Sequence, residues 1–94
     1  MDLAFFKQSL SSAKPPPGLD IYLESLWEDA RGNWDRSHNL IQDLTDKKAA
    51  WIHAYLHRKE GDIWNADYWY SKAGRKRPEL TLEEEWETIV EELI

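Results

Sequence analysis

The sequence predicts an all-α protein of about six helices. Apolar residues recur at helical spacing, and no stretch alternates between apolar and polar residues over a useful length. Glycine and proline fall between the predicted helices and not inside them. We expect two antiparallel helical hairpins, over residues 19–44 and 47–74, with an N-terminal helix over 2–13 and a C-terminal capping helix over 81–94. The length suits one domain, residues 1–94.

The helix boundaries are predicted from residues that favour helix ends. Polar side chains such as aspartate and threonine cap helix N-termini, and glycine ends a helix in the left-handed conformation. The residues expected to cap a helix are Asp20, Asn33, Asp62 and Thr81, the last in a capping box with Glu84. The residues expected to end one are Gly32, Gly61 and Gly74. Pro15, Pro16 and Pro17 separate the N-terminal helix from the first hairpin.

The last helix is predicted to bury one stripe and expose the rest. Its apolar positions are Leu82, Trp86, Ile89, Val90 and Leu93. The glutamates expected to face solvent are Glu83, Glu84, Glu85, Glu87, Glu91 and Glu92.

The two hairpins form an internal repeat, because Gly32-Asn33-Trp34 and Gly61-Asp62-Ile63 lie 29 residues apart. The second hairpin resembles a tetratricopeptide repeat, in which a Gly-Asp turn, small residues, an aromatic residue and a proline occur at fixed spacing. The matching residues are Gly61, Asp62, Ala66, Tyr70, Ala73 and Pro78. This resemblance implies a helical repeat whose first helix in each hairpin lines a concave surface. Residues 51–70 also resemble a group of short uncharacterised proteins, which implies no activity.

Composition narrows the classes of function. The net charge of −6 argues against nucleic-acid binding, which needs a basic surface. There is no cysteine, and no apolar run approaches the roughly 20 residues of a membrane span. The chain is tryptophan-rich, with six tryptophans. We expect a soluble, cytoplasmic protein without a membrane partner.

Histidines provide one candidate site. His53 and His57 share one face of the helix over residues 47–60, and His38 lies on the preceding helix. Each imidazole can be a structural group in the core, bonded to a neighbouring polar atom. Alternatively, His53 and His57 bind zinc or a similar divalent metal, with His38 or an acid as a further ligand. A third alternative is general acid–base catalysis by one histidine, and its candidate partners are Glu60, Asp67 and Tyr68.

A second candidate site lies on another face of the same helix. Trp51, Tyr55 and Arg58 share this face, and Lys48 and Lys59 flank it. Arginine and lysine bind carboxylate or phosphate groups, and aromatic rings provide flat contact area. We therefore expect a groove for a protein or peptide partner or a small anionic ligand. Alternatively, these side chains pack inside the fold.

The sequence favours a small interaction or anion-binding module over an enzyme, with no catalytic residue identified and no cofactor expected. A metal-binding protein or enzyme that uses the histidine face is the alternative, and zinc is its expected ion. A homodimer that buries the surface aromatic residues is a further alternative.

Overall fold

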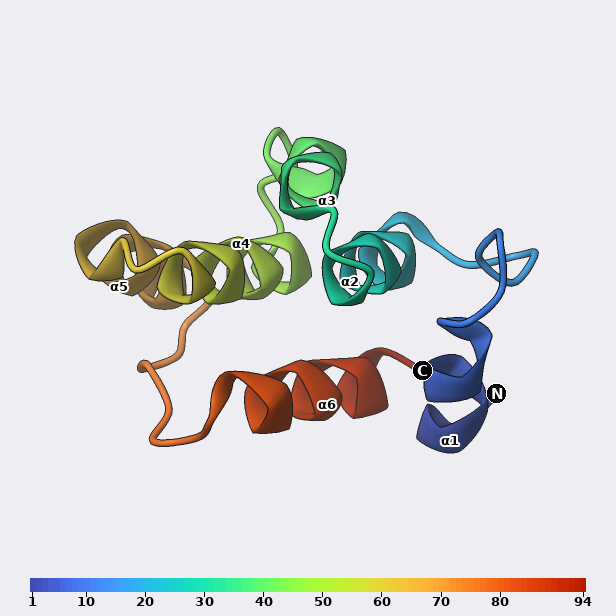
Figure 1. The fold of residues 1–94 in the computed structure, drawn as a ribbon. Coiled ribbons are helices and arrows are strands. Elements are labelled where there is room, and N and C mark those ends of the chain that lie inside the picture. Colours follow the sequence, from blue (N-terminus) through green and yellow to red (C-terminus); the bar gives the residue numbers. More distant parts are fainter.

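The computed structural model describes all residues from Met1 to Ile94 and contains six α-helices and no β-strand (Figure 1). This confirms the predicted all-α class. The helices are α1 (Leu3–Ser9), α2 (Ile21–Ala30), α3 (Trp34–Ile41), α4 (Lys47–Lys59), α5 (Ile63–Lys72) and α6 (Leu82–Leu93). None of them combines the length and the apolar character that crossing a lipid bilayer requires.

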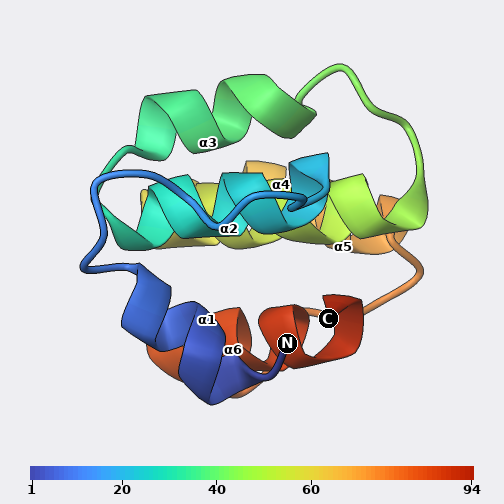
Figure 2. The ribbon, with the colours of Figure 1, turned by 90° about the vertical axis from the view of Figure 1, so that its right-hand side faces the viewer.

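The helices are arranged in three levels (Figures 1 and 2). Helix α3 lies at the top, α2, α4 and α5 form the middle level, and α1 and α6 form the lower level. The closest neighbours are α2 with α3 and α4 with α5, which are the pairs that the predicted hairpins contain. Helix α6 packs beneath both α2 and α4, and α1 packs on α6. Both chain termini therefore lie on the lower level.

Helix α4 is the centre of the core. Every residue from Ala49 to Leu56 is buried, and α4 contacts α2, α3, α5 and α6. A helix that is surrounded by other helices cannot keep a polar face in water, so small and aromatic residues occur all around it. The polar residue in this buried run is His53, which is 5% exposed.

The turn between α4 and α5 follows from two residues. Gly61 adopts a φ of +89°, a conformation in which a side chain is strained. The amide of Asp62 then donates to the carbonyl of His57 at 2.9 Å, which closes the end of α4. The Asp62 carboxylate accepts a hydrogen bond from the amide of Asn65, as an N-cap does. This confirms both predicted end signals and brings α5 back along α4.

The N-terminal helix is shorter than predicted. It ends at Ser9 instead of residue 13, and the following amides bond carbonyls three residues back. Arg31 of the next helix donates to the carbonyls of Leu10 and Ser12, so these carbonyls are satisfied outside a regular helix. The bounds predicted for the two hairpins and for the C-terminal helix agree with the observed bounds to within about three residues.

Asn33 does not cap α3, contrary to the prediction. Its side-chain amide donates instead to the carboxylate of Glu28 at 2.9 Å, and Arg36 donates to the same carboxylate at 2.7 Å. These bonds hold the side chain of Asn33 against Glu28, and its Oδ1 accepts no hydrogen bond from an amide in the first turn of α3. The caps predicted at Asp20 and Asp62 and the capping box of Thr81 with Glu84 are confirmed.

Candidate functional site

The three histidines of the chain lie together between α3 and α4. His38 comes from α3, and His53 and His57 lie one turn apart on α4. One ring nitrogen from each lies within 4.8 Å of the others. The Nε2 atoms of His38 and His53 are 3.0 Å apart. The structure thus brings together the three residues predicted as a polar or metal site.

Two tryptophans hold the imidazole rings in place. Trp34 stacks on His38 at a centroid distance of 4.9 Å, and Trp69 stacks on His53 at 4.0 Å. The indole N–H of Trp34 donates to the carbonyl of Leu56 at 2.8 Å, which ties α3 to α4. Because Trp34 and His38 are four residues apart on α3, they share one face of that helix. The histidine cluster therefore has flat, rigid walls.

The polar atoms of this cluster are only partly satisfied. His57 is mostly buried, and its Nδ1 lies 2.5 Å from a carboxylate oxygen of Glu60. His53 shares a hydrogen bond with His38 through Nε2, but its buried Nδ1 has no hydrogen-bond partner. Buried polar atoms without a partner are uncommon in folded proteins, so the cluster is an unusual feature of this core.

Electrostatics keep the buried imidazoles neutral. Burial, together with the neighbouring His38 and His57, lowers the pKa of His53 to about 4. Burial, followed by the nearby His57, also lowers the pKa of His38, although Glu60 and Asp35 act against this shift. A neutral imidazole offers a lone pair, which is what a metal ion or a proton donor needs.

Of the three predicted acid–base partners, one contacts a histidine and the other two have different partners. Glu60 contacts His57, as one of the predictions requires. Asp67 instead pairs with Arg77 at 3.2 Å, and Tyr68 stacks on Trp64. The structure therefore leaves a histidine–glutamate pair as the candidate for proton transfer.

The predicted binding groove on α4 is not an open surface. Trp51 is 6% exposed, and its N–H donates to a carboxylate oxygen of Glu85 at 3.2 Å. Tyr55 is 2% exposed, and its hydroxyl donates to Asp29 at 3.0 Å. The expected exposure of these two rings is wrong, because α2 and α6 cover the face on which they lie.

The basic residues of the predicted groove also have partners within the protein. Arg58 donates to Glu85 at 2.8 Å and to the carbonyl of Leu80. Lys59 pairs with Asp29 at 2.9 Å, and the ammonium group of Lys48 lies 5.7 Å from the centre of the Tyr22 ring. These contacts stabilise helix packing, and ligand binding by these residues stays a prediction.

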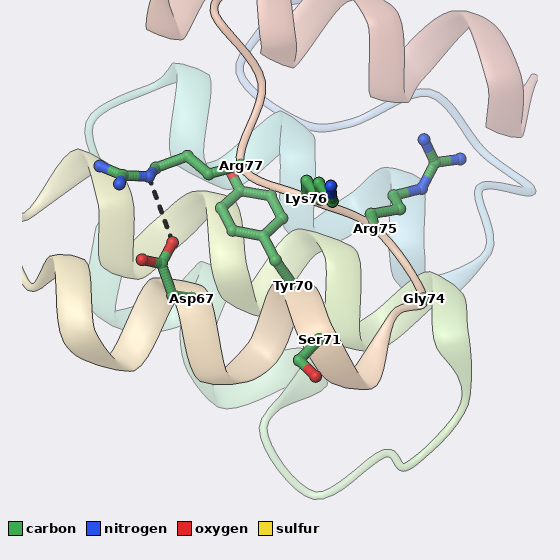
Figure 3. A pocket seen from close by; sticks show the side chains of 7 residues that line it. All are labelled: Asp67, Tyr70, Ser71, Gly74, Arg75, Lys76 and Arg77. Carbon is green, nitrogen blue, oxygen red and sulfur yellow. Dashed lines mark ion pairs between the residues drawn. The ribbon is translucent and has the colours of Figure 1, made fainter.

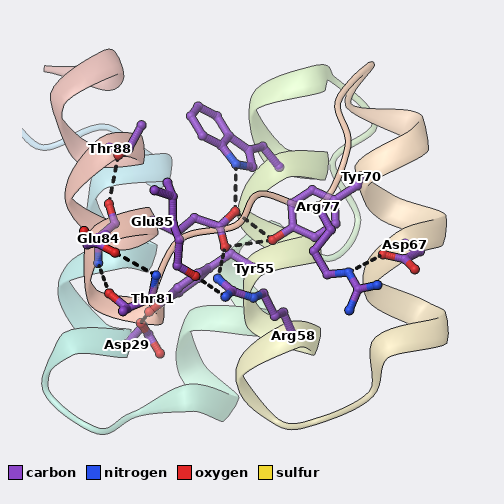
Figure 4. Close-up of polar contacts among 12 residues, drawn as sticks. Asp29, Tyr55, Arg58, Asp67, Tyr70, Arg77, Thr81, Glu84, Glu85 and Thr88 are labelled. Carbon is purple, nitrogen blue, oxygen red and sulfur yellow. Dashed lines mark hydrogen bonds and ion pairs between the residues drawn. The ribbon is translucent and has the colours of Figure 1, made fainter.

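Glu85 is the centre of a hydrogen-bond network on the face of α4 where the groove was predicted (Figure 4). It is fully buried, and it accepts hydrogen bonds from Trp51, Arg58 and the hydroxyl of Tyr70, the last at 2.7 Å. The prediction that Glu85 faces solvent is wrong. Its position could have revealed this, since Glu85 lies three residues after Leu82 and four before Ile89, within the apolar stripe. Burial and this carboxylate raise the pKa of Tyr70, which keeps its hydroxyl a donor.

A surface hollow lies at the C-terminal end of α5 (Figure 3). Its volume is about 670 Å³, and its cationic residues are Arg75, Lys76 and Arg77. The side chains do not converge on one point, because Arg77 turns towards Asp67 and Arg75 extends to the other side. Arg75 lies over the Trp51 ring at 3.5 Å and pairs with Glu92. The hollow therefore offers no assembled anion site.

The outer face of α5 exposes aromatic rings. Trp64 is 78% exposed and stacks on Tyr68, which is 46% exposed, whereas Tyr70 is buried. Tyr68 and Tyr70 therefore lie on different faces of α5, one towards solvent and one in the core. The expected protein partner or homodimer stays a prediction.

Comparison with protein-family models, curated proteins and solved structures finds no significant match to this chain. The tetratricopeptide resemblance therefore stays a prediction.

Proposed function

We propose that the protein binds a divalent transition-metal ion of the zinc type through His38, His53 and His57. The observation that supports this most directly is the convergence of three imidazole nitrogens within 4.8 Å. Around a tetrahedral zinc ion with Zn–N bonds of about 2.0–2.1 Å, ligand nitrogens lie roughly 3.3 Å apart. The 3.0 Å separation of the two Nε2 atoms of His38 and His53 is close to that spacing.

The protonation state of the cluster suits metal binding. Imidazole ligates a metal only when neutral, so a site of cationic histidines would have to lose protons first. Burial lowers the pKa values of His38 and His53, and these two rings are therefore neutral at pH 7. Metal binding there needs no proton release from them.

Glu60 provides the outer interaction that histidine ligands usually have. In metal sites, the second ring nitrogen commonly donates to a carboxylate, which fixes the tautomer and the orientation of the ring. The contact of His57 Nδ1 with Glu60 matches this pattern and leaves Nε2 of His57 for the ion. The stacked Trp34 and Trp69 restrict the other two rings.

Three protein ligands leave a fourth position for water or another small ligand. Closed structural zinc sites use four protein ligands, whereas sites with three keep one open coordination position. The half-buried His38 places the cluster near solvent, so a small molecule can reach the ion. A metal-binding or metal-dependent function is therefore the one that the geometry supports best.

Titration of tag-free, chelator-treated protein with zinc by calorimetry tests this proposal. We expect one ion per chain and a rise in stability of about 2.7 kcal/mol at a hundredfold excess over the dissociation constant. Cobalt(II) should give the visible absorption of a four-coordinate site. Absence of binding, or a stoichiometry that is not one to one, would contradict the proposal.

Substitutions of the proposed ligands and of Glu60 test whether the ion binds at the histidine cluster. His57→Asn and His38→Asn should each abolish tight binding, because each removes one of the three ligands. These two positions are chosen because they are more accessible than His53. Glu60→Gln should weaken binding by about 10–100-fold through the orientation of His57. Asn39→Ala, an exposed change next to His38, is the matched control and should bind like the unmodified protein. Unchanged zinc affinity in both histidine variants would place the ion elsewhere.

A further inference from the structure

A second hollow lies among α1, α2, α4 and α6, away from the histidines. Its volume is about 270 Å³. Tyr55 and Lys59 line it from α4, on the face opposite to His53 and His57. Most of its wall is apolar, formed by Leu10, Ala30, Tyr55, Leu82 and Trp86. It is smaller than the 300–1,000 Å³ that is typical of sites for drug-sized ligands, so it suits a smaller molecule.

This hollow contains a fixed buried anion. Asp29 is 1% exposed and lines the hollow. One of its carboxylate oxygens accepts the hydroxyl of Tyr55 at 3.0 Å, and the other pairs with Lys59 at 2.9 Å. A buried carboxylate in this setting requires a cation to offset its desolvation.

Lys59 is the replaceable partner in this arrangement. Its side chain is 37% exposed, whereas Asp29 and Tyr55 are buried. The ammonium of Lys59 can be solvated when it leaves the pair, whereas the buried carboxylate of Asp29 then needs another cation. If another ammonium takes its place on Asp29, the buried charge stays paired.

Apolar contacts would then favour the incoming ligand. A ligand with an ammonium at one end and a short apolar body can cover Leu10, Leu82 and Trp86 while it exchanges with Lys59. Burial of these apolar groups away from water favours binding. Glu83 and Lys7 also line the hollow with opposite charges, so the carboxylate of Asp29 is the group that an incoming ammonium would pair with.

We propose that this hollow binds small primary amines with an apolar body, which displace the ammonium of Lys59 from Asp29. The site uses none of the histidines, so it is independent of metal binding.

The test compares three molecules of one shape against the full chain by NMR titration: 2-phenylethylamine, the alcohol 2-phenylethanol and the acid 3-phenylpropionate. We expect chemical-shift changes at the hollow with the amine, and binding at least about tenfold weaker for the other two, which corresponds to 1.4 kcal/mol. No binding of the amine, or tighter binding of the acid, would overturn the proposal.

Two variants test the exchange and the position separately. Lys59→Met removes the internal competitor, so amine affinity should rise by about tenfold or more, or 1.4 kcal/mol. Ala30→Met fills the hollow without a change of charge and should abolish amine binding, while zinc binding at the histidines stays as in the unmodified chain. Weaker amine binding in folded Lys59→Met would refute the exchange, and unchanged binding in Ala30→Met would refute binding in this hollow. If Lys59→Met does not fold, the Ala30→Met result and the comparison of amine with acid still decide.

Discussion

Replacement of Glu85 should destabilise the protein more than any other single change of a glutamate on α6. The fully buried carboxylate accepts hydrogen bonds from Trp51, Tyr70 and Arg58. In Glu85→Ala these donors lose their acceptor, and the guanidinium of Arg58 keeps a half-buried charge without its carboxylate. Removal of one partner of a buried ion pair costs about 3–5 kcal/mol. For a domain of this size that loss lowers the melting temperature by roughly 15–30 °C.

The assay is urea unfolding followed by circular dichroism, with thermal melting beside it. Glu85→Gln keeps the size and one carbonyl acceptor but loses the charge, so it should cost about 2 kcal/mol. It is the informative variant if Glu85→Ala does not fold. Glu87→Ala is the matched control on the same helix, since Glu87 makes only a surface pair with Lys7 at 3.1 Å. That change should cost less than about 1 kcal/mol.

A small loss of stability in Glu85→Ala would refute this role of the buried carboxylate. If folded Glu85→Ala loses less than about 1 kcal/mol, as the surface control does, the carboxylate does not hold α6 to α4 and α5 in the way described. A large loss in Glu87→Ala as well would show that α6 tolerates no change, and the effect could not be assigned to the buried network.

Three further predictions concern pH and helix ends. In chelator-treated protein, His53 has a pKa of about 4 when folded and 6.5 when unfolded, so the unfolded chain binds the proton first as the pH falls. The free energy of unfolding should therefore fall by about 3 kcal/mol from pH 6.5 to pH 4. A pH profile identical to that of His53→Gln would contradict this. Gly61→Ala should lose about 1–2 kcal/mol in urea unfolding, because its φ of +89° strains any side chain, and an unchanged midpoint would show that the turn adapts. Thr81→Ala should lose about 1 kcal/mol, since the amide of Glu84 loses its cap, and a loss near zero would mean that water replaces it.

The helix pattern was largely predictable because its signals are local. Apolar spacing, capping side chains and glycines act within a few residues, and they placed both hairpins and the C-terminal helix within about three residues of their observed bounds. The N-terminal helix was the exception. Its last turn depends on Arg31, a residue of the next helix, which no local pattern reveals.

The histidine site was predictable in part. The spacing of His53 and His57 on one helix placed both on one face. The ring of His38 reaches them only because α3 packs against α4, which helical spacing does not predict. The stacking of Trp34 and Trp69 on these rings likewise depends on contacts between helices.

By itself, the sequence determined the all-α class, the turn at Gly61 and Asp62 and the shared face of His53 and His57. Only the tertiary structure decided which faces are covered. It buried Glu85 and closed the face of Trp51 and Tyr55, and it joined His38 to the other histidines. The reason is physical: helical period fixes which side chains share a face, whereas burial depends on which other helix packs there.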